Sequence, residues 1–156
     1  MILFGHIGIS VFLGSFLSLS LLPVIAGALI PDLIDKTLLL FGLIDTGRFI
    51  GHTLFLGVLI ALISYVIFRK KLVSVSLLFG YMFHLMEDAT QFVPWFYPFM
   101  SYNFSAYTFG PVFTPFNIAS EIVGVAMFIY VIRMNSHFRD ELNKFLIFGK
   151  KRLKNS

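Results

Sequence analysis

The sequence contains no cysteine, and charged residues are scarce. Only 13% of its 156 residues are charged, whereas an average soluble domain has about 25%. Without cysteine, the chain has no disulfide, no thiolate metal ligand and no cysteine nucleophile. Because 58% of the residues are hydrophobic, we expect an integral membrane protein whose apolar surface lies in a bilayer.

Basic residues are missing from the start of the chain. The segment MILFGHIGIS has no basic n-region of a signal peptide, so we expect the first apolar segment to be retained. Basic residues gather instead at positions 69–71 and from Arg133 onward. Such clusters beside apolar segments mark the cytoplasmic side. We therefore predict an integral membrane protein (cell or inner membrane) with a cytoplasmic C-terminus, and we favour anionic lipid headgroups over nucleic acid as the partner of the basic residues.

Four apolar stretches predict the helices, at residues 7–30, 53–68, 72–92 and 117–133. A spanning helix needs roughly 20 residues, so the second and fourth stretches are short. We therefore predict an all-α fold, a compact bundle of about four to five short transmembrane helices. Small and polar residues and Pro23 interrupt the first stretch, which fits either one long helix or a folded-back pair.

Two further segments complete the predicted organisation. Between the last two apolar stretches, aromatic residues alternate with four prolines, at positions 94, 98, 111 and 115, which predicts an aromatic cap at the membrane interface. Residues 135–156 alternate apolar and basic positions, which fits an amphipathic helix on an anionic membrane surface or a solvated basic end. We divide the chain into a bundle, residues 1–134, and this tail, residues 135–156.

Ionisable residues beside apolar segments are costly, so each one is a functional candidate. His84 and Asp88 have the i, i+4 spacing that puts both on one helix face, as half of a divalent-metal site or as a structural hydrogen-bonded pair. Asp32 and Asp35 share a face if their segment is helical, although an aspartate there also suits a helix start.

Arg48 and His52 lie just before the second apolar stretch. His52 is a candidate metal ligand or an interfacial polar residue. Arg48 suits a carboxylate partner, a phosphate or a simple orienting charge. If the basic clusters are cytoplasmic, all these side chains, with Glu121, gather near the extracytoplasmic face. Carboxylates and imidazoles gathered together suit zinc or another divalent metal.

His6 reaches this cluster only if the first stretch folds back. A continuous helix from His6 to Asp32 would be about 39 Å long, which would separate the two residues by the thickness of the membrane. His137, in the basic tail, is predicted to lie on the surface.

Four segments, HIGISVFLG, ALIPDLIDK, GRFIGHTLFLG and GYMFHLMEDATQFVPWFYPF, together resemble the membrane-bound metal-dependent hydrolases. That family includes inner-membrane hydrolases described as LexA-binding and is grouped with zinc phospholipase C and zinc nucleases. The resemblance covers roughly residues 3–100. By position it implies a metal site with Arg48 beside it and with the ligands His6, Asp32, Asp35, His52, His84 and Asp88.

The chain departs from that family at Phe49, Gly51 and Thr53, where the family has Gly, Thr and Ser. The later HxxxE element of zinc phospholipase C is also absent, and Glu121 is the only obvious replacement as a metal ligand. One or two metal ions, rather than three, are therefore expected.

These patterns predict a membrane-embedded metal-dependent hydrolase of a phosphoester or phospholipid-like substrate. A zinc-activated water would attack, Asp35 or Asp32 would act as general base, and Arg48 would hold the phosphate. Two alternatives stay open. One is a non-enzymatic metal- or ion-binding membrane protein, such as an oligomeric transporter subunit. The other is a structural adaptor whose polar cluster only locks helices together.

Overall fold

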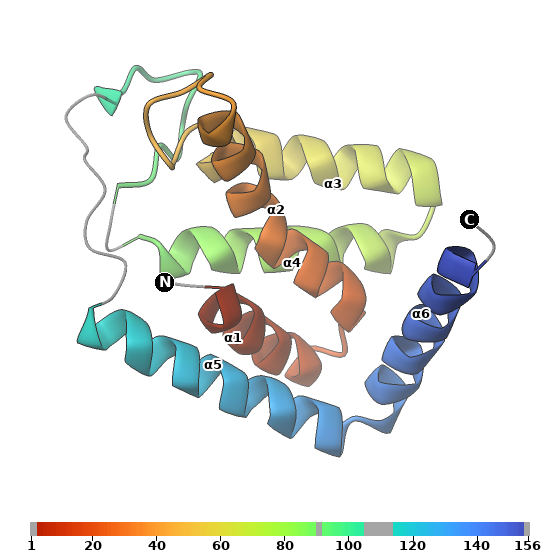
Figure 1. Ribbon diagram of the computed structural model, residues 1–156. Coiled ribbons are helices and arrows are strands. Elements are labelled where there is room, and N and C mark those ends of the chain that lie inside the picture. The colour runs from red at the N-terminus through yellow and green to blue at the C-terminus, as the bar shows by residue number, and fades with distance from the viewer. Residues whose placement is uncertain (1–2, 90–91, 105–113, 155–156) are drawn as a thin grey trace.

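The computed structural model describes residues 3–89, 92–104 and 114–154, and these contain helices and no strands (Figure 1). This confirms the all-α class for the described residues. The element order is α1 (Leu3–Phe16), α2 (Leu21–Leu40), the short 3-10 helix η1 (Ile50–His52), α3 (Leu54–Phe68), α4 (Lys71–Glu87), α5 (Pro115–Met134) and α6 (Ser136–Lys154).

The first apolar stretch forms a folded-back pair of helices. The chain reverses direction after α1, where Ser18 adopts a left-handed conformation with φ 52° and the amide of Leu19 bonds to the carbonyl of Gly14 at 3.1 Å. Ser20 then donates its amide hydrogen to Ser76 Oγ of α4 at 3.0 Å. Pro23 lies in the first turn of α2, where its missing N–H is tolerated. The N-terminal end of α1 is thereby brought back beside α2 and α4.

Two pairs of glycines allow the helices to approach closely. A Cβ atom added to Gly27 of α2 would lie 2.0 Å from a carbonyl oxygen of α4, and one added to Gly80 of α4 would lie 2.0 Å from a carbonyl oxygen of α2. Gly8 and Gly124 allow the same close approach between α1 and α5. The close contact of α2 with α4 sets the positions of the polar residues that both helices carry.

The apolar core consists of two clusters. The larger joins α1, α2, α5 and α6 through Ile7, Val11, Leu21, Val24, Val131 and Phe138, and the smaller contains Tyr81, Leu85 and Val93. Phe138 is only 1% exposed, so α6 begins by packing against the bundle. Farther along α6, Phe145, Leu146 and Ile147 are exposed. The division of the chain at residue 134 stays a prediction.

Of the helices in the described part of the chain, α5 alone is long and apolar enough to cross a membrane. Helices α1 and α3 are apolar but have 14 and 15 residues, below the usual minimum of about 17 for a span. The outer faces of α3 and α5 expose many large apolar side chains, as expected of surfaces that face lipid. A bundle of four to five spans therefore stays a prediction.

The predicted aromatic cap is described in part, over residues 92–104. The amide of Leu54, at the start of α3, bonds to the carbonyl of Trp95 at 3.0 Å, and the rings of Phe49 and Tyr97 lie 5.1 Å apart. Pro115 begins α5, whereas Pro111 lies outside the described residues. The position of this segment relative to the membrane interface stays a prediction.

Candidate metal centre

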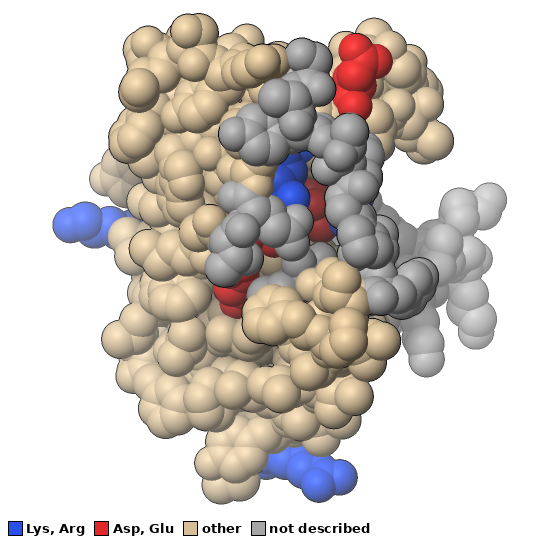
Figure 2. Space-filling model, turned by 90° about the vertical axis from the view of Figure 1, so that its left-hand side faces the viewer, with Lys and Arg blue, Asp and Glu red and all other residues tan. Residues whose placement is uncertain are grey.

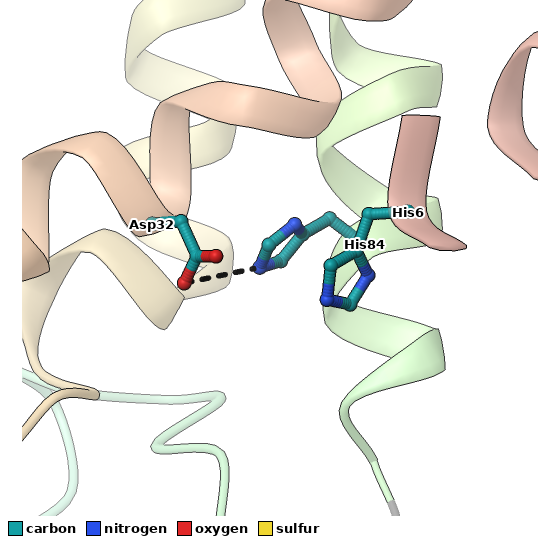
Figure 3. A group of neighbouring side chains, drawn as sticks. All are labelled: His6, Asp32 and His84. Carbon is teal, nitrogen blue, oxygen red and sulfur yellow. Dashed lines mark ion pairs between the residues drawn. The ribbon is translucent and has the colours of Figure 1, made fainter. Parts of the chain in front are cut away.

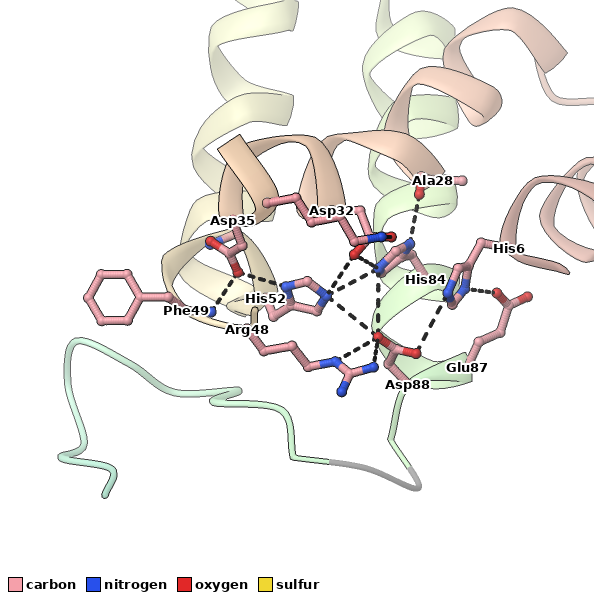
Figure 4. Close-up of polar contacts among 12 residues, drawn as sticks. His6, Ala28, Asp32, Asp35, Arg48, Phe49, His52, His84, Glu87 and Asp88 are labelled. Carbon is pink, nitrogen blue, oxygen red and sulfur yellow. Dashed lines mark hydrogen bonds and ion pairs between the residues drawn. The ribbon is translucent and has the colours of Figure 1, made fainter. Parts of the chain in front are cut away.

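Five potential metal ligands from four elements converge near the N-terminal end of α1. They form two overlapping groups, and within each group the ligand atoms all lie within 4.8 Å of one another. One group is His6 with Asp32 and His84 (Figure 3), and the other is His52 with His84 and Asp88 (Figure 4). Of the two paths that the sequence allowed for the first stretch, the folded-back pair brings His6 of α1 to the same site as Asp32 of α2. The i, i+4 pair of His84 and Asp88 and the end of η1 supply the other three ligands.

His52 is oriented by a buried carboxylate. Its Nδ1 lies 2.7 Å from Asp35 Oδ2, and a carboxylate oxygen can only accept, so Nδ1 carries the hydrogen and Nε2 faces the cluster. Asp35 is fully buried and also accepts hydrogen bonds from the amides of Phe49, at 2.6 Å, and Gly51, at 2.7 Å. The loop before α3 is thus built around Asp35, which holds the His52 ring in place.

The other two imidazoles are held in the same way. His84 donates Nδ1–H to the carbonyl oxygen of Ala28 at 2.7 Å. His6 Nδ1 lies 2.6 Å from Glu87 Oε2, and the His6 and His84 rings stack with centroids 4.0 Å apart. All three histidines therefore have Nδ1 engaged away from the cluster and Nε2 turned toward it (Figure 4). Such outer partners are usual for histidines that bind metals.

The Nε2 atoms of His52 and His84 lie only 3.2 Å apart. Because each ring already donates through Nδ1, two neutral rings would place lone pair against lone pair. That contact is stable only with a cation between the rings, either a proton or a metal ion. Burial lowers the pKa of His52, but hydrogen bonds with Asp35 and Asp88 outweigh this effect and hold the pKa above its ordinary value.

The charges around the cluster also favour a bound cation. Two cationic side chains contact its carboxylates: Arg48 donates from Nε and Nη2 to Asp88 Oδ2 at 2.8 and 2.6 Å, and Lys36 Nζ lies 2.5 Å from Asp32 Oδ2. Beside these two lie four carboxyl groups, those of Asp32, Asp35, Glu87 and Asp88. Burial favours the neutral form of Glu87. With neutral histidines, the three aspartates and the two cationic side chains then leave one excess negative charge, which a bound cation would offset.

The two acidic candidate ligands point oxygen atoms toward the imidazoles. Asp32 Oδ1 lies 3.8 Å from His52 Nε2 and 4.0 Å from His84 Nε2. Asp88 Oδ1 lies 3.6 Å from His6 Nε2, and Asp88 Oδ2 lies 3.5 Å from His52 Nε2. Nitrogen and carboxylate donors without thiolate suit zinc and related first-row metals, so the residues present fit a divalent metal.

Two charged side chains at the metal centre are partly exposed to solvent. The side chain of Arg48 is 24% exposed and that of Asp32 is 15% exposed, whereas those of Asp88 and the cluster histidines are buried. Figure 2 shows acidic and basic side chains near the middle of a face whose other described residues are largely uncharged. The exposed part of the centre therefore consists of a guanidinium group and the edge of one carboxylate.

Glu121 lies apart from both groups of potential ligands. Its two oxygens accept hydrogen bonds from the amides of Phe4, at 2.9 Å, and Gly5, at 3.0 Å, so the carboxylate caps the first turn of α1. The contact of α5 with α1 explains this position. The structure favours this capping role for Glu121 over the predicted role as a metal ligand.

Glu87 contacts the cluster although the spacing of the candidate residues did not single it out. It lies outside the i, i+4 pair of His84 and Asp88, yet its carboxyl group contacts His6 from the outer side. Its spacing of three from His84 was a usable signal, since residues at i and i+3 are neighbours on a helix. His137 lies at the surface, 85% exposed, as predicted.

The comparisons with known proteins identify the family. The YdjM inner membrane protein family matches residues 1–147, and no curated protein or solved structure gives a significant match. The match covers nearly the whole chain and confirms the predicted membrane localisation. The metal-dependent hydrolase grouping stays a prediction. The chain belongs to the YdjM inner membrane protein family.

Proposed function

We propose that this protein is a membrane-embedded, metal-dependent hydrolase of phosphoesters. The observation that carries the proposal is the convergence of three imidazole rings, each held through Nδ1 by a neighbouring oxygen atom, beside two carboxylates and a partly exposed guanidinium. A divalent metal bound there, zinc in our proposal, supplies Lewis acidity toward a phosphoryl oxygen and makes a water molecule more acidic.

The residues divide into those that hold the metal and those that orient them. His6, His52, His84, Asp32 and Asp88 would hold one or two ions. Asp35 and Glu87 contact imidazoles from the outer side, which favours an orienting role over the catalytic or metal-binding roles predicted for Asp35. As the most exposed carboxylate of the four, Asp32 is better placed to take a proton from the attacking water.

Arg48 would bind the phosphate. Its Nε and Nη2 hold Asp88 at the centre, and its side chain is partly exposed. A guanidinium presents five N–H donors in a planar fork that matches phosphate geometry. The same residue therefore positions a carboxylate and offers positive charge to a substrate oxygen beside the metal.

The proposal is tested with soluble phosphoesters. Detergent-purified protein loaded with zinc should hydrolyse bis(4-nitrophenyl) phosphate or 4-nitrophenyl phosphate, lose this activity in a chelator and regain it with zinc. Arg48→Lys keeps the charge but loses the fork, so we expect kcat/KM to fall about tenfold, which is about 1.4 kcal/mol of transition-state stabilisation. Metal content should stay unchanged.

Arg133→Gln is the matched control, because Arg133 is exposed at the far end of α5, and its kcat/KM should equal that of the unaltered protein. Protein that binds zinc fully but hydrolyses neither ester nor any lipid phosphoester would contradict the proposed hydrolase activity. The non-enzymatic metal-binding membrane protein would then be the better explanation. Activity that survives a chelator and loss of the metal would also contradict the proposed role of the metal.

We further propose that the metal centre faces the extracytoplasmic side and that α6 contacts anionic lipid headgroups on the cytoplasmic side. The basic residues 69–71 join α3 to α4, whereas His52 precedes α3 and Asp88 follows α4. The basic turn and the metal centre thus occupy opposite ends of one helix pair, and the positive end is expected to stay inside.

Because the chain has no cysteine, single cysteines can report this orientation. A membrane-impermeant maleimide should label Asp45→Cys in intact cells but label Lys70→Cys only after the membrane is opened. Both positions are exposed, so accessibility within the protein does not bias the comparison. Labelling of Lys70→Cys alone in intact cells would reverse the proposed orientation.

A further inference from the structure

An apolar groove runs along the outer side of α3. Its volume is about 350 Å³, within the range of small-molecule sites. One wall of the groove is α3, and the other is the segment 95–99, which follows Asp88 in the sequence. Every residue that lines it is apolar or aromatic: Leu54, Phe55, Val58, Leu59, Leu62, Trp95, Phe96 and Phe99. From Leu54 to Leu62 the wall extends about 12 Å along the helix.

The lining of the groove starts close in sequence to the metal centre. Leu54 follows His52 by two residues, and its amide bonds to the carbonyl of Trp95 across the groove. On the opposite wall, Tyr97 follows Phe96 and its ring contacts that of Phe49, the neighbour of Arg48. Both walls therefore lead to the loop that carries the guanidinium and one imidazole ligand.

We propose that this groove holds an alkyl chain of a membrane lipid whose phosphate headgroup lies at Arg48 and the metal centre. The placement of the headgroup rests on the proposed function. The occupant follows from polarity, because the lining is apolar throughout and the loop that carries Arg48 and His52 directly precedes Leu54 at one end. That combination matches a phosphate-bearing amphiphile. It does not match a nucleotide, whose base and sugar would leave polar groups unpaired against apolar walls.

The chain should contribute to affinity in proportion to its buried length. Burying one methylene is expected to tighten binding about fourfold, until the groove is filled. Affinity for alkyl phosphates should therefore rise steeply from butyl to octyl phosphate and level off beyond the groove's length. A headgroup-only interaction would show no such rise.

The chain contains a single tryptophan, and Trp95 lines this groove. Its fluorescence is therefore a direct reporter, because bromine quenches tryptophan at short range. Zinc-loaded protein in an unbrominated detergent would be titrated with brominated dodecyl phosphate and, separately, with brominated dodecanol. We expect saturable quenching by the phosphate, and at least tenfold weaker binding of the alcohol.

Val58→Phe adds bulk inside the groove and should weaken binding of the brominated phosphate about tenfold. Val66→Phe makes the same change on the exposed part of α3 outside the groove and should leave binding unchanged. Equal thermal unfolding of the two variants would show that both are folded. Hydrolysis of the soluble diester should be the same in both variants, since neither residue contacts the metal centre.

The outcomes separate the two proposals. Equal quenching by the phosphate and the alcohol would contradict the proposed lipid site in the groove, and so would quenching that Val58→Phe leaves unchanged. Either result would indicate ordinary boundary lipid, even if soluble esters are hydrolysed. Phosphate-selective quenching in a protein that hydrolyses no ester would support the groove and overturn the hydrolase.

Discussion

Protein purified in detergent is expected to carry one or two divalent metal ions per chain, and the double substitution His84→Ala with Asp88→Ala is expected to remove them. His84 belongs to both groups of potential ligands, and Asp88 completes one of them. Their loss would leave at most three of the five candidate ligands, in separate elements. Elemental analysis by mass spectrometry of the desalted protein measures the metal directly.

His137→Ala is the control for this loss, because His137 is a surface histidine of α6. It should retain the full metal content. Circular dichroism would establish that the double variant keeps its helices. Unaltered protein that contains no metal, and takes up none when zinc, manganese or iron is added back, would contradict the metal centre and favour a structural polar cluster.

Asp35→Asn is expected to weaken metal affinity about 100-fold, at the upper end of the usual effect of outer partners of metal ligands. Asp35 Oδ2 lies within hydrogen-bonding distance of both the Phe49 amide and His52 Nδ1, and Oδ1 accepts from Gly51. An asparagine must turn its NH2 group toward one set of these donors. Either the loop loses a hydrogen bond or His52 loses its orientation.

The same change should lower the free energy of unfolding by roughly 1–3 kcal/mol, the usual cost of leaving a buried polar group unpaired. Competition with a fluorescent chelator gives the affinity, and thermal unfolding with and without added metal gives the stability. Asp45→Asn, at an exposed position in the same loop, should change neither. An unaltered affinity in Asp35→Asn would show that Asp35 has no orienting role.

Helices α3, α4 and α5 could be predicted from the sequence because each nearly coincides with a continuous apolar stretch, and capping residues mark two of the helix starts. Thr53 accepts a hydrogen bond from the Leu56 amide at the start of α3, and Thr114 caps α5 just before Pro115. The path of the first stretch could not be predicted, since a serine with positive φ ends α1. A glycine there would have been a clear signal for the turn.

Those candidate ligands that lie close together in one helix could be predicted from the sequence. The His84–Asp88 pair depends only on spacing within one helix, so it was visible in the sequence. The roles of Glu87 and Glu121 depend on how α1 lies against α4 and α5, and this is set by the contact of Gly8 with Gly124. No local pattern encodes a contact between residues more than a hundred positions apart.

The origin of the candidate ligands in four separate elements would link the proposed metal ion to the abundance of the protein in cells. An ion that holds α1, α2, η1 and α4 together binds the folded chain and not the unfolded one. At a free metal concentration 1,000 times the Kd, this linkage contributes about 4 kcal/mol of stability. In a cell that lacks the metal, a larger fraction of the protein would be unfolded and accessible to membrane proteases. The amount of the protein would therefore follow the metal supply.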